Sequence, residues 1–261
     1  MATVALTRQF EISGVFRRMV TGISAHWKVL LGIAVGVGIL VSISTGVAMP
    51  IVLHSVDPKN PHSVLTMFVS PVYWLVTAAS ILLNAFALSA MLGALLHQGD
   101  ENEFDFASAL TSGTRDVLPM IGLTLLWMGG ILLGYILLFV PALMLLTMWS
   151  VSAPSLIAER TGVIAAFGRS RELTKGIRWP IFGALLLFAI SYVFVAFALR
   201  GFPQPGTLDL YKTNTALSFA INLVSSSFLG ILLSAFLAGL YGEVLEAKEG
   251  GSQNRLSEVF S

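Results

Sequence analysis

The chain has 261 residues, of which 56% are hydrophobic and 11% charged, and its mean hydropathy is +0.84. Soluble domains average about 25% charged residues, so this composition excludes an ordinary soluble protein and predicts one that crosses a membrane several times. The net charge of +1 gives no nucleic-acid-binding signature. The absence of cysteine excludes disulfides and thiolate metal sites, and the four scattered histidines form no zinc pattern, so we expect no metal or cofactor.

The first predicted element is an amphipathic helix within residues 9–27. Ser13 is a plausible N-cap, and Arg17 and Arg18 lie on the polar face. The apolar face comprises Phe16, Met19, Val20, Ile23 and Trp27. A helix of this kind lies in the membrane interface, and the alternative is a soluble helix that packs on a partner.

Two apolar spans follow this helix. Residues 29–50 and 71–96 are each long enough to cross a hydrocarbon core of about 30 Å. The first is longer than the signal-peptide core of about 7–15 residues, so we expect an uncleaved transmembrane helix. Ser70 and Pro71 form a favourable start for the second.

The middle of the chain, residues 117–158, is almost wholly apolar. A single helix over this stretch would be about 63 Å long, roughly twice what a bilayer core requires, so the chain must fold back. Pro141 and the Gly129-Gly130 pair are the breakers near its centre. We therefore predict a third span at about 118–139 and a shorter fourth span at about 141–158.

Two further amphipathic segments are predicted, at 106–117 and 161–178. The apolar face of the second of these comprises Val163, Ala166, Phe167, Ser170, Leu173, Thr174 and Ile177. A fifth span begins at Trp179-Pro180 and ends near residue 199, and a sixth covers about 215–245.

The layout therefore repeats three times: an amphipathic segment enters a pair of apolar spans. We predict three units (9–98, 104–158 and 161–247) within one membrane domain, residues 1–247, followed by a polar and flexible tail, 248–261. The expected fold class is an all-α polytopic membrane protein. Its six transmembrane helices form three hairpins, each preceded by an amphipathic interfacial helix on the cytoplasmic side.

The distribution of basic residues predicts the orientation. With six spans, 12 of the 15 lysines and arginines lie on the side of the termini and 3 on the other side. Five of them fall between Arg160 and Arg178. The positive-inside rule then places both termini in the cytoplasm, and we expect a bacterial inner-membrane protein.

Few residues inside the spans have side chains suited to chemistry. No ionisable residue occupies the centre of a span, which argues against proton- or sodium-coupled transport. Asn84 and Asn222 are the most polar groups at depth, and we expect either interhelical hydrogen bonds or a ligand contact.

The small-residue pairs Gly32/Gly36, Gly130/Gly134 and Ala235/Gly239 predict close helix packing. Glu159, Glu243 and Glu246 are expected to be solvated carboxylates at the span ends. No catalytic motif is present, so we predict no enzymatic activity.

A cluster of basic residues precedes the fifth span: Arg169, Arg171, Lys175 and Arg178. It determines topology, or it binds anionic lipid headgroups with Ser170 and Thr174 as additional donors.

The same region carries a family resemblance. The run AFGRSRELTKG (166–176), followed by Trp179 and preceded by Pro141 and Pro154, is similar to a pattern A-x-x-R-S-x-x-L-T-x-G-x-x-W. This pattern belongs to a broad group of bacterial six-span proteins. The group includes the YciC-like inner-membrane proteins and the membrane domain attached to some glycerophosphodiester phosphodiesterases. The resemblance implies a six-helix inner-membrane domain without an established activity, and it carries over no catalytic residue.

We therefore expect a non-catalytic membrane protein that organises lipids, anionic lipids among them, or a protein partner in the membrane through its cytoplasmic amphipathic helices. The alternative is a carrier or channel for lipid-like or small neutral molecules. A continuous polar cavity lined by Asn84 and Asn222 would favour the second function, and lipid bound at the basic cluster would favour the first. No nucleic-acid partner is expected.

Overall fold

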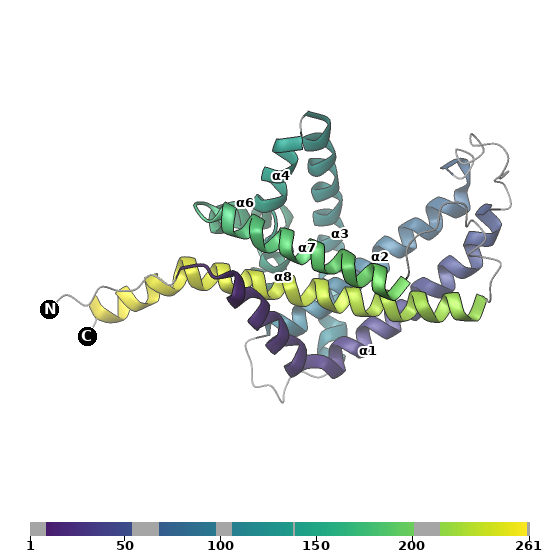
Figure 1. The fold of residues 1–261 in the computed structure, drawn as a ribbon, viewed down its shortest axis with the longest axis horizontal. Coiled ribbons are helices and arrows are strands. Elements are labelled where there is room, and N and C mark those ends of the chain that lie inside the picture. The colour runs from purple at the N-terminus through teal and green to yellow at the C-terminus, as the bar shows by residue number, and fades with distance from the viewer. Residues whose placement is uncertain (1–8, 54–67, 98–105, 138, 201–214, 260–261) are drawn as a thin grey trace.

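The computed structural model describes residues 9–53, 68–97, 106–137, 139–200 and 215–259 (Figure 1). Within these ranges the protein is helical and contains no β-strand. The helices are α1 (Ile12–Leu53), α2 (Pro71–Leu96), α3 (Phe106–Leu137), α4 (Phe139–Met148), α5 (Ser152–Glu159), α6 (Val163–Thr174), α7 (Arg178–Arg200) and α8 (Thr215–Val259).

Six segments of the described chain are long and apolar enough to cross a membrane. They are Ile12–Ala48, Pro71–Leu96, Phe106–Ile136, Val140–Glu159, Arg178–Leu199 and Phe219–Glu249. The prediction of an all-α protein with six apolar spans is therefore confirmed. Large apolar side chains are exposed along these helices, for example Leu118 on α3 (75%) and Phe194 on α7 (74%). Exposure of this extent is expected where lipid tails cover the surface.

The middle apolar stretch reverses direction between α3 and α4. A Cβ added at Gly134 in α3 would lie 3.0 Å from the Cα of Ala142 in α4, so the two backbones approach closely. The fourth span consists of two helices, because a turn at residues 149–151 separates α4 from α5. Figure 1 shows the α3/α4 pair standing at a steep angle to α7 and α8.

Two of the amphipathic segments are continuous with the spans that follow them. In α1, the backbone departs from helical geometry at His26 (φ −113°, ψ 19°), where the segment joins the first span. In α3, residues 106–117 continue into the third span through Pro119 without a break. In both, the helix continues past the glycine of the amphipathic segment (Gly22 in α1, Gly113 in α3). The third amphipathic segment is the separate helix α6.

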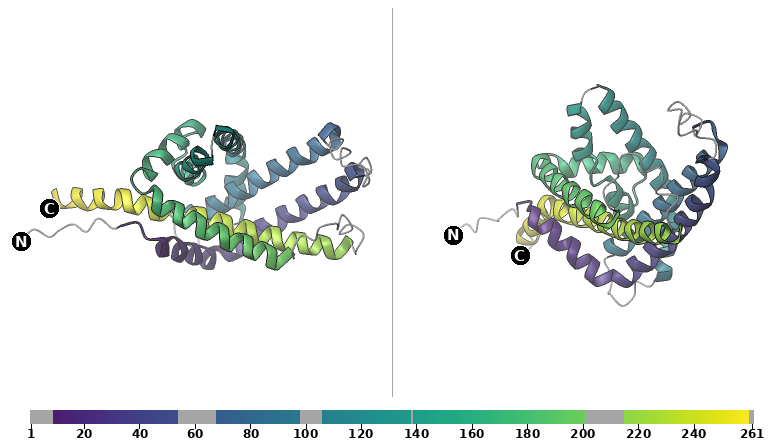
Figure 2. Two further views of the ribbon diagram at one scale, coloured as in Figure 1. Left: turned by 45° about the horizontal axis from the view of Figure 1, so that its top comes forward. Right: turned by 45° about the vertical axis from the view of Figure 1, so that its right-hand side comes forward.

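The N-terminal part of α1 packs against the C-terminal part of α8, and both lie at the same end of the molecule (Figures 1 and 2). Gly239 makes this approach possible, because a Cβ there would lie 2.7 Å from the Val15 carbonyl oxygen. Phe188 of α7 stacks on Phe236 of α8 with ring centroids 3.9 Å apart. These contacts belong to one of three hydrophobic core clusters, the one in which α1, α7 and α8 meet.

The predicted small-residue pairs are confirmed in part. The pair Ala235/Gly239 lies in the α1–α8 contact, and a Cβ at Gly130 would overlap the Trp149 ring. Gly32 faces Phe106, but nothing lies within 4 Å of a Cβ at Gly36. The prediction for Gly36 is wrong, because Gly38 makes the close approach to α8 and Gly36 faces outward.

Candidate functional site

The C-terminal part of α8, residues 241–249, makes polar contacts with helices that are distant in the sequence. Tyr241 and Glu249 contact α5 and α6, Glu243 and Glu246 contact α1, and Lys248 contacts the α6–α7 turn. The predicted tail boundary at residue 247 does not coincide with a helix end, because α8 continues as a helix to Val259. This segment therefore connects α1, α5, α6 and the α6–α7 turn through polar contacts.

Glu243 is buried (1% exposed) although it was expected to be solvated. Its carboxylate accepts a hydrogen bond from Arg18 Nε at 3.0 Å and one from the backbone N–H of Glu11 at 3.4 Å. A Cβ at Gly14 would lie 2.6 Å from the Glu243 carboxyl carbon, so only glycine leaves room for it. The carboxylate therefore lies against the positive N-terminal end of α1, where a negative charge is stabilising.

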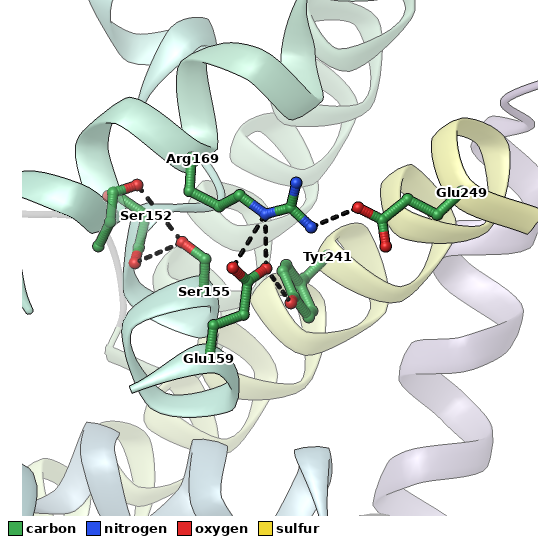
Figure 3. A network of polar contacts seen from close by, with 7 residues as sticks. Ser152, Ser155, Glu159, Arg169, Tyr241 and Glu249 are labelled. Atoms are coloured by element: carbon green, nitrogen blue, oxygen red, sulfur yellow. Dashed lines mark hydrogen bonds and ion pairs between the residues drawn. The ribbon is translucent and has the colours of Figure 1, made fainter. Parts of the chain in front are cut away.

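A second network joins α5, α6 and α8 (Figure 3). Arg169 Nε lies 2.7 and 2.9 Å from the two carboxylate oxygens of Glu159, and its Nη2 pairs with Glu249. The phenol of Tyr241 donates to Glu159 at 2.9 Å. The hydrogen bond from Glu159 raises the pKa of the Arg169 guanidinium above its ordinary value, although burial opposes this. Arg169 is therefore held in the charged form.

Two of the predicted headgroup residues have structural contacts in this arrangement. Arg169 is engaged by two carboxylates, as described above. Ser170 is fully buried and donates to the Met148 carbonyl oxygen at 2.8 Å, which satisfies a carbonyl at the C-terminal end of α4. Thr174 is also buried and donates to the Ser170 carbonyl at 2.9 Å. The apolar face of α6 thus packs on protein, and Ser170 is not available at the surface.

The remaining basic residues of the predicted cluster form a surface at the α6–α7 turn. Arg171 and Lys175 are exposed, and Arg178 is partly buried, with no hydrogen-bond partner for its Nε within the described part of the chain. Lys248 of α8 joins them by donating to the Lys175 carbonyl. We refer to Arg171, Lys175, Arg178 and Lys248 as the α6–α7 basic surface.

The local backbone explains how this surface forms. Gly176 has φ +87°, which allows the chain to turn directly after α6, and α7 begins at Arg178. The positive N-terminal end of α7 therefore lies at the same turn. Trp179 is 84% exposed beside it, as is typical of tryptophan at a membrane–water interface.

A second polar groove, of about 560 Å³, lies between α1, the end of α2 and α8. Arg17, Arg18 and Glu246 line it, together with His26 and His97. The acidic side chain offsets part of the basic charge, and Arg18 is already paired with Glu243 and Glu246. This groove is consequently less suited to anions than the α6–α7 basic surface.

The two intramembrane asparagines lie apart. Asn84 lines a cleft between α1, α2 and α3, and its Nδ2 donates to the Ser80 carbonyl of its own helix at 2.7 Å. Asn222 lies on α8 and is not among the described residues that line this cleft. The structure does not bring Asn84 and Asn222 together.

The sequence did not reveal several residues of these networks. The sequence indicated surface positions for Arg18, Glu159, Glu243 and Glu246 and gave no role to Tyr241, because the partners lie as many as 228 positions away in the chain. The one available signal was the clustering of three glutamates at predicted span ends. Among the described residues no group of histidine, aspartate and glutamate is arranged to hold a metal ion.

Comparison of the chain with protein-family models, with curated proteins and with solved structures found no match.

Proposed function

We propose that this protein binds anionic phospholipid headgroups at the α6–α7 basic surface and thereby organises lipid at the cytoplasmic face of a bacterial inner membrane. The proposed role is binding without catalysis. One observation carries it: four basic side chains gather at one turn, and none of them forms a salt bridge within the described ranges, whereas Arg169 beside them is fully paired.

The surroundings support a membrane ligand. Trp179 lies beside the basic surface, and Ile164 is 82% exposed at the start of α6; both side chains offer apolar contact at the depth of the headgroups. A phosphate accepts hydrogen bonds from Arg and Lys, and the exposed side chains of Arg171 and Lys175 offer such donors. Each basic residue near an anionic membrane surface contributes about 1 kcal/mol.

The proposed orientation has two supports. The packing of the N-terminal part of α1 against the C-terminal part of α8 supports an even number of crossings with both termini on one side. The excess of basic residues on that side is typical of a cytoplasmic face. In this orientation α6 lies at the cytoplasmic interface, as predicted for the amphipathic segments, and this layout is the one that the resemblance to the YciC-like group implies.

The proposal is tested with the full chain in nanodiscs that contain phosphatidylglycerol or phosphatidylethanolamine. Bound lipid is measured by native mass spectrometry. The test variant carries Gln at Arg171, Lys175, Arg178 and Lys248. The control variant carries Gln at four other basic residues on the side of the termini: Arg17, Lys28, Arg115 and Arg160.

We expect the test variant to lose at least about tenfold in bound phosphatidylglycerol, because several contributions of about 1 kcal/mol are removed. The control variant should retain its bound phosphatidylglycerol. Equal retention by both variants, or equal loss, would contradict the proposal.

A carrier or channel for lipid-like or small neutral molecules is the second candidate function. The observation that favours it is the cleft that Asn84 lines. Flux of a fluorescent neutral solute or lipid in proteoliposomes tests it, and wild-type flux no higher than that of empty liposomes would exclude it for that molecule.

A further inference from the structure

The cleft between α1, α2 and α3 is distinct from the basic surface. It has a volume of about 440 Å³ and lies along the first part of α2, at the end away from the groove that Arg17 and His97 line. On α2 the lining residues recur at steps of three and four, so they form one stripe from Tyr73 to Leu88. This stripe is about 22 Å long at 1.5 Å per residue, more than the depth of about 15 Å of one leaflet.

The described residues give the cleft no formal charge. Its described lining residues include no Asp, Glu, Lys, Arg or His, and its polar side chains are those of Thr45, Tyr73, Thr77, Ser80, Asn84 and Thr124. A charged group in the hydrocarbon region without a counter-charge is strongly disfavoured. The ligand that fits is therefore uncharged, with an apolar body that follows the rest of the lining and a small polar group.

The hydrogen bonds of the cleft indicate which polar group this is. The hydroxyls of Thr45, Thr77 and Thr124 each donate to a backbone carbonyl of their own helix at 2.8 Å. A hydroxyl has one proton and two acceptor lone pairs, so these three present acceptors to the cleft. Asn84 adds an amide oxygen, since only its Nδ2 donates to Ser80. A ligand that donates a proton satisfies them.

We infer that this cleft binds an uncharged lipid with a free hydroxyl group, of the long-chain alcohol or diacylglycerol type. The hydroxyl donates to the threonine and asparagine oxygens, and the alkyl chain lies along the α2 stripe against Ala48, Ile81 and Leu88. The site is separate from the α6–α7 basic surface, so either proposal can fail while the other holds.

The experiment uses the full chain in phosphatidylcholine nanodiscs and two photoactivatable probes. One is a long-chain alcohol that carries a diazirine and a clickable alkyne, and the other is its methyl ether, which has the same shape and no donor. Adducts are located at single residues by tandem mass spectrometry. We expect the alcohol to label residues 73–88 of α2 and 45–52 of α1 about fivefold more than the ether, as the loss of one hydrogen bond implies.

Two conservative variants and one control complete the test. Thr77→Val and Asn84→Leu each remove one acceptor from the cleft and should each lower labelling by the alcohol toward the level of the ether. Ser191→Ala removes a similar hydroxyl bond to a helix carbonyl on the exposed face of α7 and should leave labelling unchanged. Equal labelling of the wild-type cleft by alcohol and ether would overturn the inference, whatever the variants do. So would adducts that favour the outward residues Leu75 and Leu82.

Discussion

The buried pair of Arg18 and Glu243 allows a quantitative test of how α1 is attached to α8. Glu243 is 1% exposed, whereas the side chain of Arg18 is 36% exposed and also contacts Glu246. Arg18→Met leaves the buried carboxylate without its cation, and removal of one partner from a buried pair costs about 3–5 kcal/mol. The hydrogen bond from the Glu11 N–H remains, so we expect a value near the lower end, about 3 kcal/mol.

The reverse substitution should cost less. Glu243→Gln keeps an oxygen that can accept from Arg18, and the partly exposed guanidinium retains Glu246 and water as partners. We expect a loss of about 1–2 kcal/mol, which corresponds to the loss of charge assistance in one hydrogen bond. The asymmetry between the two single variants is the result that follows from the difference in burial.

The assay is reversible unfolding of the purified chain by steric trapping in a lipid bicelle, with a double-mutant cycle. The variant that carries both Arg18→Met and Glu243→Gln should lose less than the sum of the two single losses, because the unpaired carboxylate is then absent. Equal losses for the two single variants, or losses that add within about 0.5 kcal/mol, would refute the assignment of Glu243 as a buried, paired carboxylate.

Four further outcomes are expected. Gly239→Ala should destabilise the fold by about 1–3 kcal/mol because its Cβ would meet the Val15 carbonyl. Gly36→Ala should be neutral or stabilising by up to about 1 kcal/mol. The same unfolding assay compares the two variants, and a reversed order of stability would contradict the packing. Tyr241→Phe should cost about 1 kcal/mol through loss of its hydrogen bond to the α5 carboxylate, with unchanged stability as the opposing result. Phosphatidylglycerol retained by the wild-type chain should fall as salt rises from 0.05 to about 0.5 M, since screening weakens exposed ion pairs, and salt-independent retention would argue against a headgroup site. The chain contains no cysteine, so single cysteines can test the orientation in intact cells. Glu172→Cys should react only with a membrane-permeant thiol reagent, whereas Val69→Cys should react with an impermeant reagent as well. The opposite pattern would reverse the proposed orientation.

Local hydropathy and length were sufficient to predict the spans. An apolar segment must be about 20 residues long to cross a bilayer core, and this requirement acts on consecutive residues. The two runs after Trp27 and Ser70 were therefore predictable, and so was a reversal of the chain between the spans at 118–139 and 141–158. The buried face of α6 was predictable for a similar reason, because helical periodicity places Ala166, Ser170 and Leu173 on one side.

The same local rules did not locate the helix breaks and the single-residue packing. The sequence suggested an interfacial helix that ends before the third span, but residues 106–137 have no interruption strong enough to stop helix propagation. Gly36 and Gly38 are equally small, and the rotation of α1 relative to α8 decides which of them faces a neighbour. The position of that contact depends on both helices together.

The amino-acid sequence alone determined that this is a helical protein of six apolar spans. The free energy of moving a segment into the bilayer depends on the hydrophobicity and length of that segment, not on distant residues. Only the tertiary structure decided which charged groups are paired within the fold and which are exposed. Arg169 and Arg171 are two positions apart in one basic run, yet Arg169 meets Glu159 and Glu249 while Arg171 is exposed. The partners of a side chain depend on where distant helices place their carboxylates, and no local pattern contains that information.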